Sequence, residues 1–338
     1  MDGDNDPAER ARLTELITAC WSTQVIHVAV RLGLPDRLAA GPAQAGALAE
    51  QTGSHPGALF RLLRAMEVLG LVRRLDGDRF ELTPMGRLLG ADAEGSIRGM
   101  AMHWGERLWG ALSQLDQSVQ TGQPWKASGL AGFQQMAHDP AQMVMFHQSM
   151  TDQTGPVARA ILGAYDFSRF RSVMDVGGSY GALLAAVLKA HPALEGSVYD
   201  LADLAAASRA YLKSAGVSKR AAFTGGDFFQ SVPAGADAYM LKMIIHDWDD
   251  AKAQAILSRC REAAGGDGVV LVMERIVPAQ IGPSDLTTIR GDMLMLTAAG
   301  GMERTEQEYR SLFSASGLSL RAIYPTASGF SVMEGAAA

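Results

Sequence analysis

The stretch RSVMDVGGSYGALLAAVLKAHPALEGSVYD, residues 171–200, predicts a strand, a glycine turn, a helix and a second strand. A short apolar run leads through Asp175 to the turn Gly177–Gly181. The alanine- and leucine-rich run that follows is typical of a buried helix, and a second strand-like run ends on Asp200. In open α/β sheets, ligands bind beyond the carboxyl ends of the strands. We therefore expect Asp175 and Asp200 to face one ligand.

The turn and its two acids predict a cofactor that carries a ribose. Glycine lets the backbone approach a ligand closely, and an acid at the end of the second strand commonly binds ribose hydroxyls. Asp200 follows Gly177 by 23 residues (200 − 177), near the ~20 of such sites. The alternative is that Gly177–Gly181 is only a tight strand-to-helix turn.

Two ribose-bearing cofactors compete for this turn. A dinucleotide needs the spacing G-x-G-x-x-G, with its pyrophosphate at the helix N-terminus, and the turn GGSYG lacks that spacing. Asp175 would also repel a pyrophosphate, whereas a carboxylate suits a cationic ligand. S-adenosylmethionine has a ribose, an adenine, an amino group and a sulfonium. The residues therefore favour S-adenosylmethionine.

Strand-like and helix-like runs alternate after Arg171. The expected strands are Ser172–Val176, Gly196–Tyr199, Ala221–Thr224, Ala236–Ile245 and Gly268–Glu274. The expected helices are Ala182–Ala190, Leu204–Ser214 and Asp250–Ala264. Such alternation predicts a parallel sheet with helices on both faces. The tail LSLRAIYPTASGFSVMEG, residues 318–335, predicts a C-terminal hairpin that turns at Ser328-Gly329.

The first hundred residues predict a smaller domain of helices and one hairpin. Apolar periodicity indicates helices between Arg12 and Ala40, and further helices are expected at Ala45–Gln51 and Pro56–Leu69. The run LVRRLDGDRFELT predicts a hairpin that turns at Asp76-Gly77. Helix, turn, helix and β-wing form a winged-helix pattern. We expect this domain at residues 1–100, a helical connection that contributes to the substrate pocket at 101–165, and the α/β domain at 166–338.

The composition argues against several classes of protein. The 338 residues are long enough for two domains or one large one, and 48% of them are hydrophobic, enough to bury a core. The net charge of −6 argues against a general nucleic-acid binder. Cys20 and Cys260 lack metal-type spacing, which favours a reducing cytoplasm. The acidic N-terminus is unlike a secretory signal, and no run approaches the ~20 apolar residues of a membrane span. We expect a cytoplasmic protein with no nucleic-acid or membrane partner.

The run ADAYMLKMIIHDWDDAKAQAIL, residues 236–257, places a histidine at the same sheet edge. An apolar strand is expected to end at His246. A neutral imidazole is the side chain best able to take a proton from a hydroxyl near pH 7, although an edge histidine without catalytic work is the alternative. Asp249 or Asp250 is expected to cap the next helix. These acids straddle a strand end and a helix start, so no metal is expected.

Four motifs in this order resemble the caffeic-acid-type and bacterial small-molecule O-methyltransferases: VMDVGGSYG, GDFF, LKMIIHDWDD and GGMERTEQEY. The likeness covers about residues 15 to 335. It implies a class I enzyme of secondary metabolism that uses S-adenosylmethionine. It also implies a Rossmann-like, doubly wound, mostly parallel seven-stranded sheet. Ser179 stands where the family usually has a third glycine, and we expect tighter packing at the cofactor there.

The resemblance also implies roles for single residues. His246 is the general base, Glu274 and Glu303 flank and orient it, and Asp247 adjoins it. For both glutamates the alternative is a surface salt bridge, and for Lys242 it is an exposed strand-end lysine. The residues implied at the cofactor are Asp175, Gly177 and Gly181 at its methionine part, Asp200 at the ribose, Leu201, Asp227 and Phe228 at the adenine, and Lys242 along its edge.

The expected acceptor is a small aromatic with a hydroxyl, such as a phenol, a quinone-like polyketide or a phenazine. An apolar pocket suits such a molecule. Its candidate lining residues are Trp104, Met150, Trp248, Met293 and Met295, for which the alternative is a place in the core. The resemblance implies that the N-terminal domain joins two subunits. We expect a homodimer whose interface is rich in residues 12–40 and 85–110.

Two other functions stay open. One is a ligand-sensing transcription regulator that retains the methyltransferase fold, which salt-dependent duplex binding by residues 40–90 would reveal. The other is a relative that binds the cofactor but decarboxylates, hydroxylates or methylates nitrogen. A base at His246 favours methyl transfer to oxygen.

Overall fold

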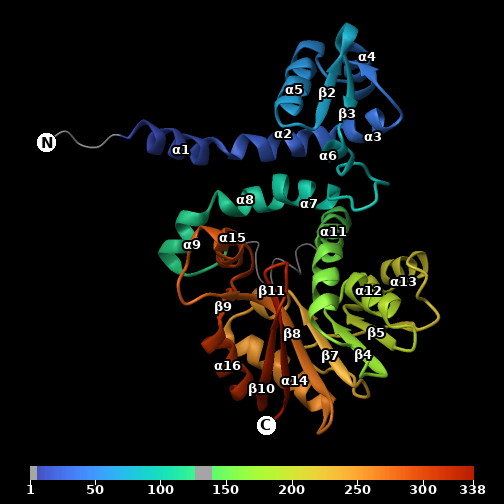
Figure 1. The fold of residues 1–338 in the computed structure, drawn as a ribbon, viewed down its shortest axis with the longest axis vertical. Coiled ribbons are helices and arrows are strands. Elements are labelled where there is room, and N and C mark those ends of the chain that lie inside the picture. Colours follow the sequence, from blue (N-terminus) through green and yellow to red (C-terminus); the bar gives the residue numbers. More distant parts are fainter. Residues whose placement is uncertain (1–5, 126–138) are drawn as a thin grey trace, which may run out of the picture. The chain divides into compact units, whose positions relative to one another are not determined.

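The computed structural model describes residues 6–125 and 139–338. The chain forms two compact units, Met1–Trp109 and Gly110–Ala338 (Figure 1). Over the described ranges, none of the helices combines the length and the apolar character that a membrane crossing requires. The expected division at residues 100 and 165 stays a prediction.

The first unit has the predicted helices and hairpin. Its helices are α1 Pro7–Thr18, α2 Cys20–Arg31, α3 Leu34–Ala39, α4 Ala45–Thr52, α5 Pro56–Val68, α6 Pro84–Arg87 and α7 Arg98–His103. Strands β2 Val72–Leu75 and β3 Arg79–Leu82 form the antiparallel wing, and the short β1 Ala43–Gln44 pairs with β3. Gly53 and Gly70, both with φ near +60° to +70°, follow α4 and α5 as predicted. The winged-helix pattern is therefore confirmed.

The second unit is an α/β domain. Its strands are β4 Ser172–Val176, β5 Glu195–Asp200, β6 Ala221–Gly225, β7 Ala238–Lys242, β8 Val269–Val277, β9 Arg304–Thr305, β10 Leu318–Pro325 and β11 Phe330–Ala337. Its helices are α9 Leu115–Thr121, α11 Pro140–Ala164, α12 Ala182–Ala190, α13 Ala205–Ser214, α14 Asp250–Ala264, α15 Leu286–Leu294 and α16 Glu306–Ala315, while α8 Trp109–Leu112 spans the unit boundary.

The sheet has the predicted doubly wound order. Seven strands follow the path β10-β11-β8-β7-β4-β5-β6, and the two-residue β9 pairs with β8. The pairs β8–β7, β7–β4, β4–β5 and β5–β6 are parallel, and the C-terminal hairpin adds two antiparallel strands. After β4 the chain adds β5 and β6 on one side of that strand, and it then crosses over to add β7 on the other side. Ligands in such folds bind at this reversal of strand order.

Helices cover both faces of the sheet. Successive residues of a strand point to opposite faces, so Val173 packs in one apolar layer with α11 and α12. Its neighbour Met174 packs in the other layer, with α14 and α16. Full burial of one aliphatic side chain stabilises the fold by about 1.5–3 kcal/mol. These two layers fix the strand ends from which the candidate site residues project.

Candidate active site

The turn after β4 packs tightly against its neighbours. Gly177 has φ +70°, and a Cβ built there would lie 2.5 Å from Ile244 Cδ1. Its amide donates to the Tyr199 carbonyl oxygen at 2.8 Å, which joins the turn to the end of β5. A side chain at Gly177 would therefore clash and strain the backbone. Gly181, with φ +86°, precedes α12 and closes the turn.

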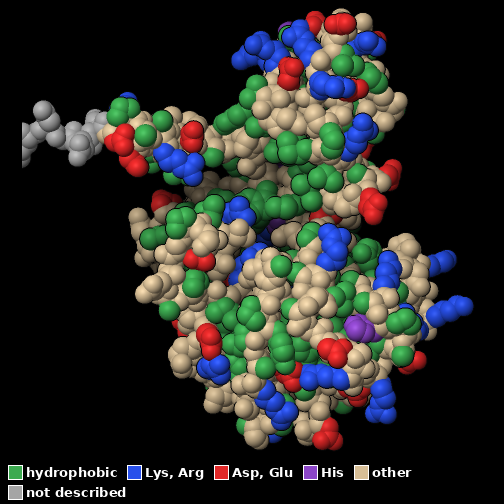
Figure 2. Space-filling model, viewed as in Figure 1, with side chains coloured by type: hydrophobic (Ala, Val, Ile, Leu, Met, Phe, Trp, Pro, Cys, Tyr) green, Lys and Arg blue, Asp and Glu red, His purple; other side chains and the backbone are tan. Residues whose placement is uncertain are grey.

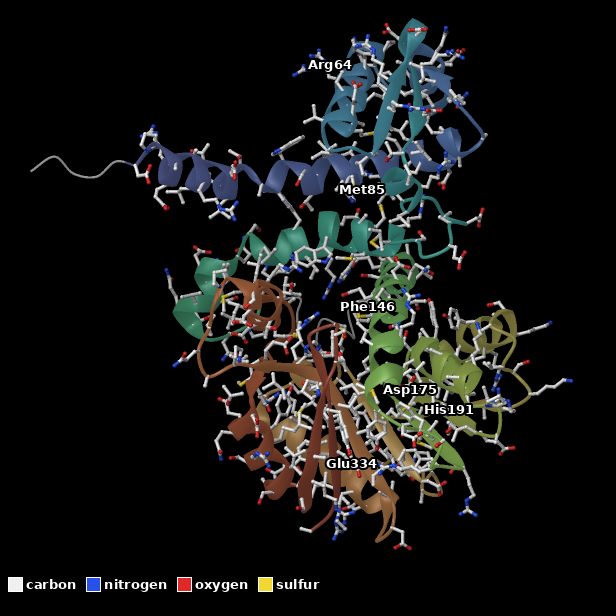
Figure 3. All side chains as sticks on the ribbon, viewed as in Figure 1. Arg64, Met85, Phe146, Asp175, His191 and Glu334 are labelled. Carbon is white, nitrogen blue, oxygen red and sulfur yellow. The ribbon has the colours of Figure 1, made fainter. Side chains whose placement is uncertain are left out.

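Asp175 and Asp200 lie together at the carboxyl ends of two paired strands, where the sequence placed them. Asp175, labelled in Figure 3, is 2% exposed and accepts the Leu184 amide at 3.3 Å. Asp200 accepts the Ser179 and Leu201 amides, each at 2.7 Å. A carboxylate oxygen can accept two hydrogen bonds, so these oxygens keep acceptor positions for a ligand.

Burial changes the charge of these acids. It raises the pKa of Asp175 to about 7, although the Lys242 ammonium opposes that shift. Burial also raises the pKa of Asp200. Burial lowers the pKa of Lys242, against the charge of Asp175, and this side chain is partly buried at the end of β7 rather than an exposed lysine. A cation bound at this edge would favour the ionised form of both acids.

Ser179 and His147 form a contact that the sequence analysis missed. Ser179 has a left-handed φ of +55°, and its Oγ lies 2.6 Å from His147 Nδ1, on α11 beside the labelled Phe146 (Figure 3). His147 is 6% exposed, and its Nε2 has no hydrogen-bond partner among the residues that the structure describes. Burial lowers the pKa of His147 to about 4, so the ring is neutral near pH 7. An unpaired buried ring nitrogen beside the turn is a candidate ligand contact.

The candidate base His246 lies in a short helical turn. The prediction that an apolar strand runs to His246 is wrong, because β7 ends four residues earlier, at Lys242, and Met243 has φ +56°. The backbone amides of Ile244 and Ile245 both donate to Glu274 Oε1 on β8, at 2.9 and 3.0 Å. This carboxylate replaces the strand ladder and bends the chain into the turn Ile245–Asp247.

Three carboxylates surround the His246 imidazole. Its Nδ1 donates to Glu303 Oε1 at 2.9 Å and lies 3.6 Å from Glu274 Oε2. Its Nε2 lies 3.6 Å from Asp247 Oδ1, beyond hydrogen-bonding distance. Glu274 is 0% and Glu303 7% exposed, so the surface salt-bridge alternative is wrong for both. The geometry fixes Nδ1 and leaves Nε2 for another partner.

The imidazole and the carboxylates compete for protons. Burial by itself would lower the pKa of His246, but the carboxylates of Glu274, Glu303 and Asp247 outweigh it and raise that pKa. Burial raises the pKa of Glu274, and it raises the pKa of Asp247 to about 6, while the charge of His246 opposes both shifts. We assign the Nδ1 proton to the imidazole, because Glu303 accepts from that nitrogen directly. The facing carboxylates also stabilise the imidazolium, so the ring must first be neutral at Nε2 to act as a base.

The same group presents atoms that a metal ion could bind. One ligand atom each of His246, Glu274 and Glu303 lies within 4.8 Å of the other two. His246 Nδ1 and Glu303 Oε1 already bind each other, and Glu274 Oε1 holds two backbone amides. These atoms position the imidazole, and the absence of a metal stays a prediction.

The residues implied at the adenine lie near β5 and β6. Leu201 follows Asp200 and is 49% exposed, whereas Asp227 accepts the Phe229 amide at 2.9 Å. The Phe228 ring lies 3.6 Å from the position of a Cβ on Gly177, which brings it to the turn. Their roles toward the cofactor stay predictions.

The candidate acceptor residues divide into three groups. Met150 on α11, Met293 on α15 and Met295 in the π-helical turn Met295–Ala299 are partly buried in the second unit. That turn packs against the turn that carries His246. Trp248 is 5% exposed in the core, with its ring centre 4.9 Å from that of Phe229, which favours the core alternative. Trp104 belongs to the first unit.

Comparisons with known proteins match both units. The family described as "O-methyltransferase domain" matches residues 112–319, and the "O-methyltransferase dimerisation domain" matches residues 14–92. The chain is 37% identical to phenazine O-methyltransferase PhzM of Lysobacter antibioticus, over 95% of this chain and 94% of the relative. It is 36% identical to O-demethylpuromycin-O-methyltransferase of Streptomyces alboniger (98% and 92% covered). It is 32% identical to phenazine-1-carboxylate N-methyltransferase of Pseudomonas aeruginosa (96% and 96% covered).

Comparisons with solved structures agree with these family matches. The crystal structure of LaPhzM superposes with a TM-score of 0.93 at 35% identity, over 97% of this chain and 99% of that one. An O-methyltransferase (NcsB1) from neocarzinostatin biosynthesis, solved with S-adenosylmethionine and 2-hydroxy-5-methyl naphthoic acid, has a TM-score of 0.76 at 34% identity (94% and 96% covered).

The residues at the sheet edge fit S-adenosylmethionine. Asp175 and Asp200 suit a cation and a ribose, and a Cβ on Gly177 would fill the space that the backbone leaves beside Ile244 and Phe228. The family match covers more than half of the chain, and the relatives match nearly all of it. The chain therefore belongs to the O-methyltransferase family, and it is an enzyme that uses S-adenosylmethionine.

Proposed function

We propose that the chain methylates a hydroxyl of a small aromatic acceptor, with His246 as general base. The observation that carries this proposal is the 2.9 Å bond between His246 Nδ1 and Glu303, close to the carboxyl ends of the central strands. Because Glu303 holds His246 through Nδ1, the other ring nitrogen, Nε2, can accept the proton of the acceptor hydroxyl. Two acids for the donor lie at the carboxyl ends of neighbouring strands, Asp175 one residue before the end of β4 and Asp200 at the end of β5.

S-adenosylmethionine supplies a methyl group that its sulfonium charge has already activated. With the ring neutral, His246 Nε2 takes the proton of the acceptor hydroxyl, a contribution of typically ~10²–10⁴-fold to the rate. Glu303 and Glu274 hold the ring and stabilise the imidazolium that forms. Alignment of acceptor and donor by the surrounding side chains supplies a further part of the rate enhancement.

The acceptor class follows from the partly buried methionines and from the relatives. Met150, Met293 and Met295 offer flexible apolar side chains that suit flat aromatic molecules. Relatives are named for phenazine substrates, and NcsB1 was solved with a hydroxynaphthoic acid. We therefore expect a phenolic, naphthoic or phenazine hydroxyl.

The direct test is methyl transfer from methyl-labelled S-adenosylmethionine to a panel of aromatic hydroxyls. The panel includes 2-hydroxy-5-methylnaphthoic acid, a hydroxyphenazine and simple phenols, each paired with the analogue that carries an amino group in place of the hydroxyl. Mass spectrometry that locates the label on oxygen supports the proposal. Label on the amine alone favours the N-methylating alternative, for which one relative supplies a precedent.

We propose that the enzyme is a homodimer joined through its first unit. Large apolar side chains stay exposed on α1 and α2, where Figure 2 shows hydrophobic atoms at the surface: Leu13, Leu16, Ile17, Trp21 and Val28. Helix α1 has no buried residue, so none of the described residues covers its apolar side chains. Apolar surface of this kind favours a protein partner. The match to the dimerisation-domain family supports a second copy of this chain as that partner.

The charges of the wing weigh against the DNA-binding alternative. Arg73 pairs with Glu81, and Arg74 pairs with Asp78 on the same hairpin. Paired arginines are less available to release counterions from phosphates. Duplex binding that weakens with salt would still reveal a regulator.

A further inference from the structure

Arg304 is a buried cation that binds the turn carrying His246. Its side chain is 0% exposed. One guanidinium nitrogen, Nη1, donates to the Ile245 carbonyl oxygen at 3.1 Å, and Nη2 donates to the Trp248 carbonyl oxygen at 2.7 Å. Nε and Nη2 also donate to Asp250 Oδ1, at 2.9 and 2.8 Å.

These acceptors bracket the candidate base. Ile245 directly precedes His246, Trp248 follows it by two residues, and Asp250 begins α14. One planar group therefore ties both ends of the turn to the start of the next helix. A buried guanidinium needs such partners, because an unpaired charge is strongly disfavoured away from water.

The residues before Arg304 bind the same turn. Glu303 accepts from His246 Nδ1, and the Met302 amide donates to the His246 carbonyl oxygen at 2.9 Å. A Cβ on Gly301 would lie 2.0 Å from that carbonyl oxygen. Arg304 itself begins β9, which pairs with β8 next to Glu274 (Figure 1). The segment 301–304 thus holds the base by side chain and backbone together.

We propose that Arg304 is a positioning residue, which places the His246 imidazole between Glu303 and Glu274 by fixing both ends of its turn. This inference deepens the proposed function and rests on it. Arg304 acts through the turn and does not touch the reacting atoms. Lysine cannot replace it, because a single ammonium cannot reach three acceptors spread across a turn and a helix start in the way a planar fork does.

Loss of Arg304 has a specific expected consequence. The two carbonyl groups and the Asp250 carboxylate lose their shared donor, and the turn gains freedom to move away from Glu303. The imidazole then moves away from the carboxylates of Glu274, Glu303 and Asp247. The Lys242 ammonium interacts with Glu274 and Asp247 and opposes their charge. Donor binding stays, because Asp175, Asp200 and the glycine turn belong to β4 and β5.

The test compares Arg304→Ala and Arg304→Lys with Arg310→Ala. Arg310 on α16 pairs with Glu306, and both are about half exposed, so its loss controls for a missing arginine nearby. Affinity is measured by calorimetry with S-adenosylhomocysteine. The His246 ring is followed by NMR of ¹⁵N-histidine-labelled protein, assigned by the signal that is lost in His246→Gln.

We expect both Arg304 variants to bind S-adenosylhomocysteine within threefold of the wild type. The His246 titration moves down toward the ordinary value in Arg304→Ala, and less so in Arg304→Lys, while Arg310→Ala leaves it unchanged. Methyl transfer falls at least tenfold in kcat for Arg304→Ala, and added guanidinium restores part of it. A folded Arg304→Ala with an unchanged His246 titration overturns the proposal, and so does full activity of Arg304→Lys.

A second variant keeps the test decisive if Arg304→Ala does not fold. Asp250 is 73% exposed, so Asp250→Asn removes the charged partner of Arg304 at the surface. It is expected to shift the His246 titration in the same direction by a smaller amount, and no shift contradicts the proposal. The NMR readout needs no acceptor. A wild type that transfers no methyl group therefore refutes the proposed function while the positioning role is still measured.

Discussion

Ser179 is strained, and a buried histidine holds it. A left-handed conformation costs a residue other than glycine about 1–2 kcal/mol, and the bond to His147 offsets part of that cost. The Ser179 amide also binds Asp200, the acid expected at the ribose. The pair therefore links the turn to cofactor binding.

We predict that His147→Phe weakens binding of S-adenosylhomocysteine by about threefold to tenfold, because a net hydrogen bond contributes about 0.5–1.5 kcal/mol. Ser179→Gly in the same chain should recover most of this loss, since glycine adopts the turn without strain. Calorimetry on the wild type, both single variants and the double variant measures the coupling. Strictly additive effects would show that the two residues act independently.

The sequence predicted which residues lie near strand ends, but it did not predict contacts between side chains on different helices and strands. Asp175 and Asp200 were placed correctly near the carboxyl ends of β4 and β5, because apolar runs mark the extent of a strand. Glu303 came from the resemblance alone, and its bond to His246 bridges 57 positions. His147 left no local signal, and Arg304 stood in the GGMERTEQEY motif without a predicted role, because their partners lie 32 and 54 or more positions away.

The pKa of Asp175 predicts a pH-dependent affinity for the cationic donor. Burial raises that pKa from the ordinary value of 3.8 to about 7, so the acid is mostly neutral at pH 5.5 and mostly charged at pH 8. S-adenosylmethionine should therefore bind at least threefold more tightly at pH 8. Calorimetry at both values checks this, and Asp175→Asn should flatten the dependence. If the affinity of Asp175→Asn still changed with pH as in the wild type, groups other than Asp175 would be responsible for the pH dependence.

At the scale of elements, one carboxylate decides where a strand ends. The sequence predicted a strand at Ala236–Ile245, and β7 stops at Lys242. Apolar residues continue beyond that point, so periodicity gave no stop signal. Glu274, on the neighbouring strand, accepts the amides of Ile244 and Ile245 and so starts the turn of His246. By contrast, α12 and α14 have the predicted bounds, because glycine and aspartate mark their ends locally.

The turn of His246 has no room for a side chain at Gly301. A Cβ there would lie 2.0 Å from the His246 carbonyl oxygen, so Gly301→Ala must displace the turn. We predict a fall in kcat of at least tenfold and a destabilisation of about 1–3 kcal/mol. Kinetics and thermal unfolding test this against Gly266→Ala, where a Cβ meets nothing within 4 Å. Equal effects at both glycines would contradict the close packing.

At the scale of the whole molecule, alternation of strands and helices predicted the sheet. The resemblance implied that the sheet is doubly wound and mostly parallel, and the strand path from β10 to β6 confirms this. The assembly of subunits depends on surfaces that face outward, and periodicity within one chain identifies only faces that are buried in it. The exposed apolar side chains of α1 show this limit.

The dimer predicts a specific sensitivity on α1. Ile17 is 68% exposed in the chain, so Ile17→Glu should leave the fold intact and shift the protein toward monomer, since it would bury a charge at an apolar interface. Leu286→Glu is the matched control, because Leu286 in the second unit is also 68% exposed. Light scattering at micromolar concentration measures the mass. A wild type that is already monomeric would contradict the proposed assembly.

The most direct test of the account is the rate of methyl transfer by His246→Ala with the donor bound to saturation. The account predicts a fall of at least tenfold, up to about 10⁴-fold, while the dissociation constant of S-adenosylmethionine stays within threefold of the wild type. That outcome separates the base from the acids that bind the donor. An unchanged rate in a variant that binds the donor normally would contradict the role of His246 and the mechanism built on it.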